Sequence, residues 1–271
     1  MPRLCPASDL GVSCLASIFM KRLLKNTLRR FGYDLVRYSP ISELASVPDM
    51  SEAQQKIISA AKPFTMTSVE RMAALINAVT YVTQNGIPGD IAECGVWRGG
   101  SIMTVALTLL AHGDRNRSIY LFDTFEGMSS PTADDKSLDG VSADVQLERD
   151  PRGTGIWCYA SLDEVRANIL STGYPEEKIH LIKGKVEDTI PRNIPSKLSL
   201  LRLDTDWYES TKHELKHLYP ILDPKGILII DDYGHWQGAK KAVDEYFAGL
   251  GGNIYLHRID YTGRILVRTG T

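Results

Sequence analysis

The chain has 271 residues, of which 43% are hydrophobic and 24% are charged, and its formal net charge is −2 at pH 7. The length suits one large α/β domain with an extension, or two small domains, and the composition is that of a soluble globular protein. The charge gives no electrostatic footprint for nucleic acid, and no apolar run approaches the roughly 20 residues that cross a bilayer.

The four cysteines, Cys5, Cys14, Cys94 and Cys158, show no CxxC spacing. We therefore expect neither a disulfide framework nor a zinc site, and a reducing cytoplasm is the predicted location. The short apolar stretch at 11–20 precedes the basic cluster, whereas in a secretory signal the basic residues come first.

Residues 1–63 are predicted to form an N-terminal extension and linker, ahead of one α/β domain at 64–271. Within the extension, residues 21–30 are basic and amphipathic, which predicts a helix. This helix could lie on an anionic membrane surface, or it could dock on the protein with its polar face in solvent. We favour docking and expect no stable membrane insertion, because one short helix has little membrane affinity.

The next helix is predicted to begin at Thr67 as its N-cap, with Glu70 completing a capping box, and to end at Gly86. Beyond Asp90, short apolar runs alternate with helical segments, which predicts a doubly wound, mostly parallel sheet of seven strands. The strands are expected at 91–94, 119–122, 179–182, 198–203, 227–230, 254–256 and 265–267, and the helices at 100–112, 161–173, 209–219 and 237–249. The last two strands would form a C-terminal antiparallel hairpin that turns at Gly263.

Residues 128–160 interrupt this alternation with a long polar insertion. Insertions of this length are usually functional or disordered. Because the insertion follows the carboxyl end of the second strand, we favour a mobile lid over the ligand crevice.

A glycine-rich turn joins the first strand to its helix at 90–101. Glycines let the backbone approach a ligand, and the helix N-terminus presents free N–H groups. Trp97 stands where a dinucleotide fingerprint has its second glycine, and Glu93 precedes the turn. That carboxylate disfavours nucleotide phosphates and suits a ligand with an ammonium group.

Two later segments are candidates for the same ligand. Asp123 ends the second strand 23 residues after Gly100, a spacing at which an acid commonly binds ribose hydroxyls. The alternative for Asp123 is a helix N-cap. Residues 183–188 follow the third strand, where they could border an adenine ring or form an ordinary polar loop.

Carboxylates follow the fourth and fifth strands directly, as Asp204 and Asp206 and as Asp231 and Asp232. The carboxyl ends of parallel strands open onto one crevice, so these four side chains should meet. Crowded carboxylates repel one another unless a cation or a proton intervenes, and oxygen ligands suit Mg²⁺.

These motifs together resemble class I S-adenosylmethionine-dependent methyltransferases and, more narrowly, the macrocin O-methyltransferase family, which methylates sugar hydroxyls in natural-product and glycan pathways. The resemblance covers about 64–247 and is carried by the motifs at 92–101, 122–127, 201–211 and 230–234. It implies S-adenosylmethionine and Mg²⁺ as cofactors. The implied cofactor-binding residues are Glu93, Gly95, Val96, Trp97, Arg98, Gly99 and Ser101 for the methionine end, Asp123 and Phe125 for the ribose, and Gly184, Glu187 and Asp188 for the adenine.

The resemblance further implies that Asp204, Asp231 and Asp232 ligate the metal. The catalytic base stays open between Asp204 and Asp206, because the position where one type of family member has a histidine is Trp207. His235 directly follows the Asp231–Asp232 pair, where it could be an alternative base, an acceptor contact or, more commonly, only a polar loop histidine. The expected acceptor is a small molecule or glycan with adjacent hydroxyls, and the family implies a homo-oligomer. A catechol-type phenolic O-methyltransferase, a nicotinamide-dependent oxidoreductase and a non-catalytic cofactor-binding protein are the alternatives.

Overall fold

The computed structural model describes residues 24–33, 49–150, 155–251 and 254–269. The chain divides into two compact units, Met1–Ser42 and Glu43–Thr271. In the first unit, residues 24–30 are helical, as predicted, while the rest of the expected basic helix lies outside the described residues.

The second unit begins earlier than the expected boundary at residue 64. Helix α2 (Glu52–Ala61) and the 3₁₀ helix Lys62–Phe64 form part of it. Ile58 of α2 is buried together with Met72 in one small apolar cluster. Residues 52–63 therefore belong to the α/β unit by their packing.

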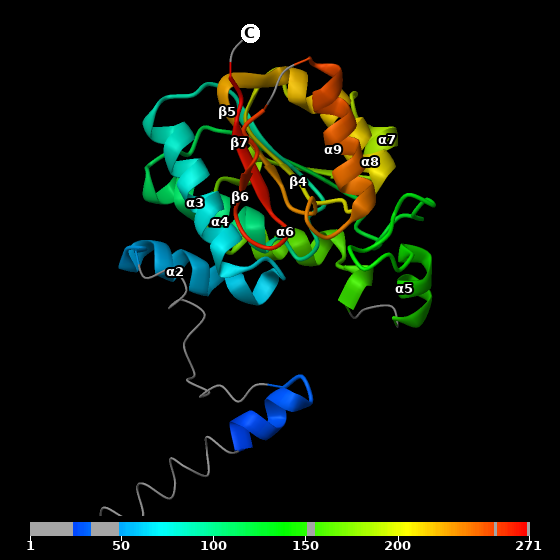
Figure 1. Cartoon of the computed structure of the whole chain (residues 1–271). Helices are drawn as coiled ribbons and strands as arrows, with labels where there is room; N and C mark the ends of the chain where they lie inside the picture. Colours follow the sequence, from blue (N-terminus) through cyan, green and yellow to red (C-terminus); the bar gives the residue numbers. More distant parts are fainter. Residues whose placement is uncertain (1–23, 34–48, 151–154, 252–253, 270–271) are drawn as a thin grey trace, which may run out of the picture. The chain divides into compact units, whose positions relative to one another are not determined.

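Seven strands form one sheet in the order β3-β2-β1-β4-β5-β7-β6 (Figure 1). They are β1 (Asp90–Cys94), β2 (Ile119–Asp123), β3 (Ile179–Lys183), β4 (Leu198–Leu203), β5 (Leu222–Ile230), β6 (His257–Arg258) and β7 (Arg264–Val267). The first five are parallel, and β7 and β6 add an antiparallel hairpin at the edge of β5. The predicted sheet, including its C-terminal hairpin, is confirmed.

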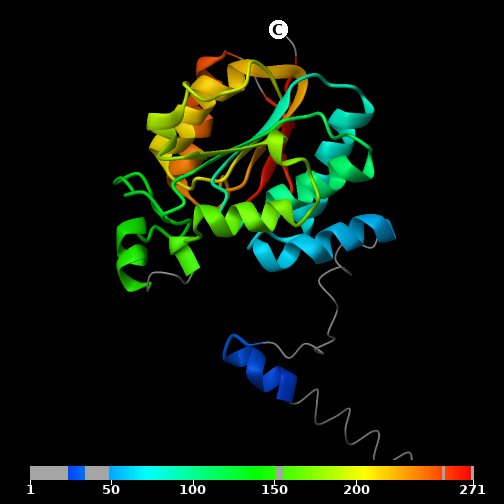
Figure 2. The same ribbon diagram turned by 180° about the vertical axis from the view of Figure 1, so that it is seen from behind.

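Helices cover both faces of the sheet, as both ribbon views show (Figures 1 and 2). One face carries α3 (Val69–Gln84), α4 (Gly100–Ala111) and α6 (Leu162–Leu170), and the other carries α7 (Val186–Thr189), α8 (Tyr208–Leu218) and α9 (Gln237–Gly249). Each set buries its apolar side chains in a separate core against the sheet. Besides Lys62–Phe64, the described residues form three short 3₁₀ helices, which are Gly155–Trp157, Glu176–Lys178 and Tyr219–Ile221. In the described part of the chain, no helix is both long and apolar enough to cross a membrane.

Two local predictions were wrong. The N-cap of α3 is Ser68, whose hydroxyl accepts a hydrogen bond from the Arg71 backbone N–H at 3.1 Å, whereas the Thr67 hydroxyl accepts from Arg202. The first strand of the hairpin lies at β6, three residues beyond its expected start. Asp260 accepts bonds from two backbone N–H groups of the turn, and this turn sets the register of the hairpin.

The insertion at 128–160 contains the short helix α5 (Ala143–Arg149) and is attached to the domain through buried Asp135. One carboxylate oxygen of Asp135 accepts a bond of 2.7 Å from the Tyr208 N–H at the start of α8, where no local side chain caps the helix. A Cβ at Gly238 would lie 2.0 Å from that oxygen, so only glycine fits there. A lid motion of the insertion stays a prediction.

Candidate active site

A cavity of about 220 Å³ opens at the carboxyl ends of the parallel strands. It is bordered by the turns after β1, β2, β3, β4 and β5, and by the start of the insertion. The predicted residues that line it are Gly95, Val96, Trp97, Ser101, Asp123, Gly184, Glu187, Asp204, Asp206, Asp231 and Asp232. The topology therefore brings most of the candidate residues to one place.

The glycine-rich turn is shaped by its contact with the neighbouring strand. Gly95 has φ +80°, and a Cβ on it would lie 2.0 Å from the carbonyl oxygen of Asp204. A side chain at this position would separate the turn after β1 from the metal-site turn after β4. Gly95 thus sets the close approach of two parts of the cavity wall.

Asp123 connects the turn after β2 to the glycine-rich turn. Its Oδ2 accepts bonds from the backbone N–H groups of Val96 at 2.6 Å and Trp97 at 3.2 Å, and its Oδ1 accepts one from Phe125 at 2.7 Å. Burial raises the pKa of Asp123, and these N–H donors oppose the rise. The Thr124 hydroxyl is a fourth donor, 3.5 Å from Oδ1, so Asp123 holds the turns after β1 and β2 together at the cavity wall.

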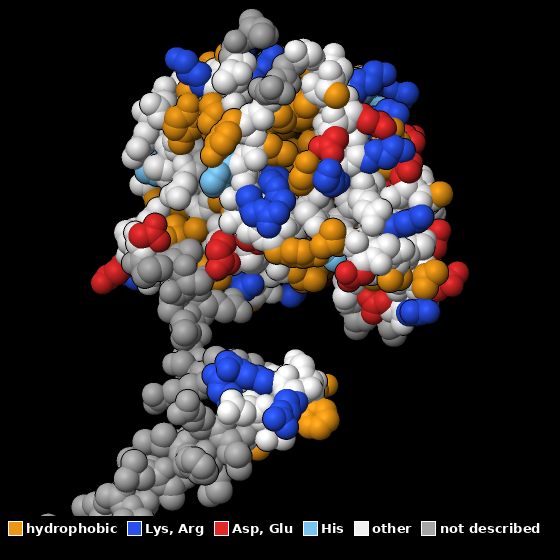
Figure 3. All heavy atoms as spheres, in the orientation of Figure 1, with side chains coloured by type: hydrophobic (Ala, Val, Ile, Leu, Met, Phe, Trp, Pro, Cys, Tyr) orange, Lys and Arg blue, Asp and Glu red, His pale blue; other side chains and the backbone are white. Residues whose placement is uncertain are grey.

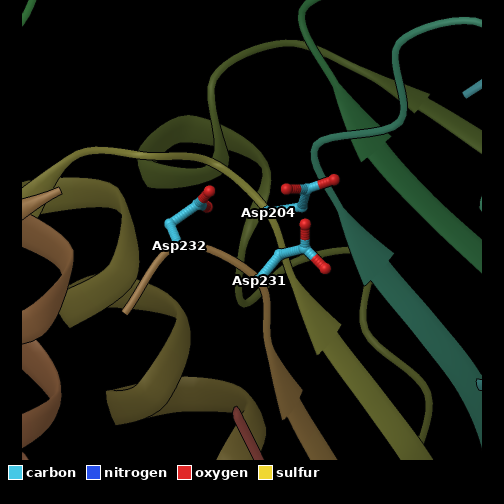
Figure 4. A group of neighbouring side chains, drawn as sticks. All are labelled: Asp204, Asp231 and Asp232. Atoms are coloured by element: carbon cyan, nitrogen blue, oxygen red, sulfur yellow. The ribbon is translucent and has the colours of Figure 1, made fainter. Parts of the chain in front are cut away.

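Asp204 directly follows β4, whereas Asp231 and Asp232 directly follow β5. The three side chains point toward one another (Figure 4). One carboxylate oxygen from each lies within 4.8 Å of the others. Asp231 and Asp232 are 3% and 9% exposed, so water does little to screen their repulsion. These are the oxygen ligands that a hard divalent cation prefers.

Arg202, which is 3% exposed, lies beneath this carboxylate group. It is the register partner of Glu93 on the neighbouring strand β1, and its guanidinium group contacts the Glu93 carboxylate. It also forms ion pairs with Asp204 at 2.7 Å and with Asp231 at 2.8 Å. One buried cation therefore joins β1, β4 and β5 at the floor of the site.

A second arginine, Arg71 of α3, contacts the other carboxylate oxygen of Asp231, Oδ2, and also pairs with Asp260 at 3.0 Å. Even with both guanidinium groups in place, the Oδ1 atom of Asp231 accepts no well-directed hydrogen bond. Its ion pair with Arg202 is close but poorly aligned. This buried oxygen has unused capacity to bind a ligand or ion.

The electrostatics of the group favour a further positive charge. Burial raises the pKa of Asp204, with Arg202 opposing the rise and Asp231 and Asp232 adding to it. Burial and the neighbouring Asp206 and Asp231 likewise raise the pKa of Asp232. Carboxyl groups outnumber the two arginines, and a divalent cation would relieve their repulsion. The residues present therefore fit Mg²⁺.

Asp206 lies beside the three carboxylates with a left-handed backbone, φ +65°, which is uncommon for a residue other than glycine. Its backbone N–H donates to Asp232 at 3.1 Å, which holds the turn in this conformation. Burial raises the pKa of Asp206 to about 7, and Asp204 contributes to the rise. A carboxylate with this pKa can accept a proton near neutral pH.

Six predicted site residues lie outside the cavity wall. Glu93 is buried against Arg202, and Phe125 is part of the core. Arg98 pairs with Glu164 of α6 at 2.7 Å, and Gly99 is the N-cap of α4. Asp188 is exposed, and His235 lines a second cavity. Glu93 thus acts on the site through Arg202 in this structure.

Several residues that border the cavity were not named as site residues from the sequence, and they are Thr65, Met66, Thr67, Arg71, Met128, Ser129, Cys158 and Ser210. Arg202 was also missed. A lone arginine inside the apolar run of β4 was a usable signal, because a buried charge needs a partner. Arg71 gave no such signal, since an arginine on an amphipathic helix is ordinarily solvated.

The model of the family described as macrocin O-methyltransferase (TylF) matches residues 35–268. One relative, from Streptomyces olivaceus, is 36% identical over 199 residues, which are 73% of each chain. It is named 8-demethyl-8-(2,3-dimethoxy-α-L-rhamnosyl)-tetracenomycin-C 4'-O-methyltransferase. Demethyldecarbamoylnovobiocin O-methyltransferase of Streptomyces niveus is 34% identical over 209 residues, 77% of each chain.

A solved structure gives the same result. The O-methyltransferase NovP superposes with a TM-score of 0.67 at 33% identity, covering 76% of this chain and 83% of NovP. The fold, the cavity and these matches agree on a class I, S-adenosylmethionine-dependent O-methyltransferase. The chain belongs to the macrocin O-methyltransferase family.

Proposed function

We propose that this methyltransferase acts on a hydroxyl of a sugar carried by a glycosylated natural product, with Mg²⁺ held by Asp204, Asp231 and Asp232. The observation that carries the proposal is the convergence of these three carboxylates within 4.8 Å, in the same cavity as the glycine-rich turn. The name of the Streptomyces olivaceus relative, which specifies a rhamnosyl substrate, supports a sugar acceptor.

In this proposal the cofactor occupies the part of the cavity away from the metal site. The glycine-rich turn and Ser101 would hold the methionine end, and Asp123 would hold the ribose. Gly184 and Glu187 would border the adenine. The turns that carry these residues follow the neighbouring strands β1, β2 and β3 in this order. The methionine, ribose and adenine groups follow one another in the same order along the cofactor.

When bound, S-adenosylmethionine supplies an electrophilic methyl group and Mg²⁺ supplies Lewis acidity that lowers the pKa of a hydroxyl. The chain's own contribution is to position the two reactants and to accept a proton. Asp206 is the proposed base, because its carboxylate lies in the cavity beside the three proposed metal ligands and is not itself one of them. His235 is a weaker candidate, since its Nδ1 is bonded to the Tyr261 hydroxyl at 2.7 Å in the second cavity.

The assignment of the base predicts different effects for two substitutions. Asp206→Asn should lower kcat by about a hundredfold or more, the usual contribution of a general base. His235→Ala should leave kcat within about threefold of wild type. Steady-state kinetics at saturating cofactor and metal would measure both. A large loss for His235→Ala together with a small one for Asp206→Asn would transfer the role to His235.

The proposed function is tested by methyl transfer from labelled S-adenosylmethionine to a panel of glycosides and catechols, with Mg²⁺ and with EDTA. We expect transfer to glycosides that carry adjacent hydroxyls, and its loss in EDTA. Preferential transfer to catechols would favour a phenolic O-methyltransferase. Cofactor binding in calorimetry without transfer to any acceptor would favour a non-catalytic binding protein.

Two further expectations concern the protein in the cell. Assembly into a homo-oligomer and a cytoplasmic location stay predictions. A sedimentation experiment on the full chain would test the first, and fractionation of the source cells would test the second.

A further inference from the structure

A second cavity, of about 230 Å³, lies on the other side of the loop that carries two of the proposed metal ligands. Residues 233–237 of this loop line it, together with Leu138 of the insertion, Lys240 of α9, and Arg258, Tyr261 and Arg264 of the C-terminal hairpin. On this face of the molecule, a group of Lys or Arg side chains lies close to the place where Figure 1 shows β6 (Figure 3). We call it the hairpin cavity.

The hairpin cavity contains positive charge that the described residues do not neutralise. Arg264 is only 7% exposed, and its Nη1 donates to the backbone carbonyls of Thr262 at 3.2 Å and Gly263 at 2.8 Å. Among the described residues, no carboxylate pairs with Arg264 and no acceptor bonds its Nε or Nη2. Nε and Nη2 therefore keep donor capacity for an anion, and Arg258 lies opposite Arg264 in the hairpin, so that two guanidinium side chains meet at this cavity.

Neighbouring cations add to this charge. Arg258 lies close enough that its charge disfavours that of Arg264, and within the described ranges it forms no ion pair. The Arg264 guanidinium lies 5.1 Å from the centre of the Tyr233 ring, and Lys240 lies 5.2 Å from it. Lys240 is paired with Asp244, which also accepts a bond of 2.7 Å from the Tyr233 hydroxyl. The nearby carboxylate of Asp260 favours the charge of Arg264 but also pairs with Arg71, so it offsets only part of the charge of the two arginines.

The hairpin cavity shares its walls with the active site. Asp231 and Asp232 border the first cavity, and the next residues of the same loop border the second. The insertion also reaches both, with Met128 and Ser129 at the first and Leu138 at the second. A ligand in the hairpin cavity would thus contact the loop and the insertion that also enclose the reacting groups.

We propose that the hairpin cavity binds an oxyanion, a phosphate or carboxylate group, through Arg258 and Arg264. A guanidinium fork matches such a group with paired N–H donors. The oxyanion could be a free small anion or a group attached to the methyl acceptor; only the second case rests on the proposed sugar methylation. Oxyanion binding itself needs neither Mg²⁺ nor S-adenosylmethionine.

The site is tested by calorimetric titration of the full chain with inorganic diphosphate in buffer that contains EDTA. We expect saturable binding that Arg258→Glu weakens by at least about tenfold, because reversing the charge turns attraction into repulsion. Arg258 is exposed on an edge strand, so this variant should fold, which circular dichroism would verify. The matched control is Arg115→Glu, the same charge change at an exposed residue in the loop before β2, which should bind as wild type does.

A parallel titration with uridine diphosphate glucose distinguishes the two sources. Tighter binding than that of diphosphate, with the same sensitivity to Arg258→Glu, supports an oxyanion on the acceptor. Equal or weaker binding supports a free anion. Absence of binding by either probe, or equal weakening by Arg258→Glu and Arg115→Glu, would overturn the proposal. Because no cofactor is present, that failure would leave the methyltransferase function untouched.

Discussion

Asp204→Asn is expected to bind Mg²⁺ at least about a hundredfold more weakly than wild type, and to lower kcat/KM by about a thousandfold or more. The substitution keeps the shape of the side chain and removes one of three converging carboxylates. Lewis-acid stabilisation by a metal is worth several kcal/mol, and each 1.36 kcal/mol is about tenfold in rate. Calorimetric titration with Mg²⁺ and methyl-transfer kinetics would measure the two effects.

The same variant should bind S-adenosylmethionine normally in metal-free buffer, because the cofactor wall formed by β1, β2 and β3 is unchanged. In metal-free buffer its free energy of unfolding should be no lower than that of wild type. Arg202 keeps Glu93 and Asp231 as partners, and one repulsive charge is lost. Glu126→Gln, the same chemical change at an exposed carboxylate, is the matched control. Normal Mg²⁺ binding by Asp204→Asn would refute the metal assignment.

The fold could be predicted because its signals are local and repeated. Each parallel strand is a short apolar run, and a helical pattern follows most of them, so the order and the carboxyl-end crevice follow from known topology. The hairpin was predicted as well, but β6 begins three residues late. Its place depends on the hydrogen bonds of Asp260 in the turn, which periodicity does not reveal.

The cavity was predicted less completely, and the reason is physical. Asp204, Asp231 and Asp232 could be identified because strand ends converge and like charges crowd there. The direction of a side chain within a strand is harder to infer. Glu93 was expected to contact the cofactor, but its side chain points to the face of the sheet that α3 covers, where Arg202 of the adjacent strand lies in register with it.

Contacts between distant elements were beyond sequence reasoning. Asp135 of the insertion binds the N-terminus of α8, 73 residues away, and Arg71 of α3 reaches Asp231, 160 residues away. Neither residue has a sequence context that distinguishes it from a solvated surface residue. Only the packing of the insertion against α8 and of α3 on the sheet creates these two contacts.

Arg202→Met should destabilise the protein by about 3–5 kcal/mol, because it leaves buried carboxylates without their shared counter-charge. Arg202 is 3% exposed and Glu93 is 1% exposed, so water cannot replace the lost partner. Urea denaturation in EDTA would measure the free energy of unfolding. Arg98→Met is the matched control, since Arg98 forms a half-exposed pair with Glu164 and should cost less than about 1 kcal/mol.

The destabilisation of Arg202→Met should depend on pH in a defined direction. Burial raises the pKa of Glu93 to about 7 even with Arg202 opposing the rise, and without Arg202 it should rise further. A carboxyl group whose pKa is higher in the folded state binds its proton more tightly there, so stability falls as pH rises from the unfolded pKa, about 4, through the folded one. The loss relative to wild type should therefore be smaller at pH 5 than at pH 8. An equal loss at both pH values would show that lost packing, and not an unpaired buried charge, is what the arginine prevents.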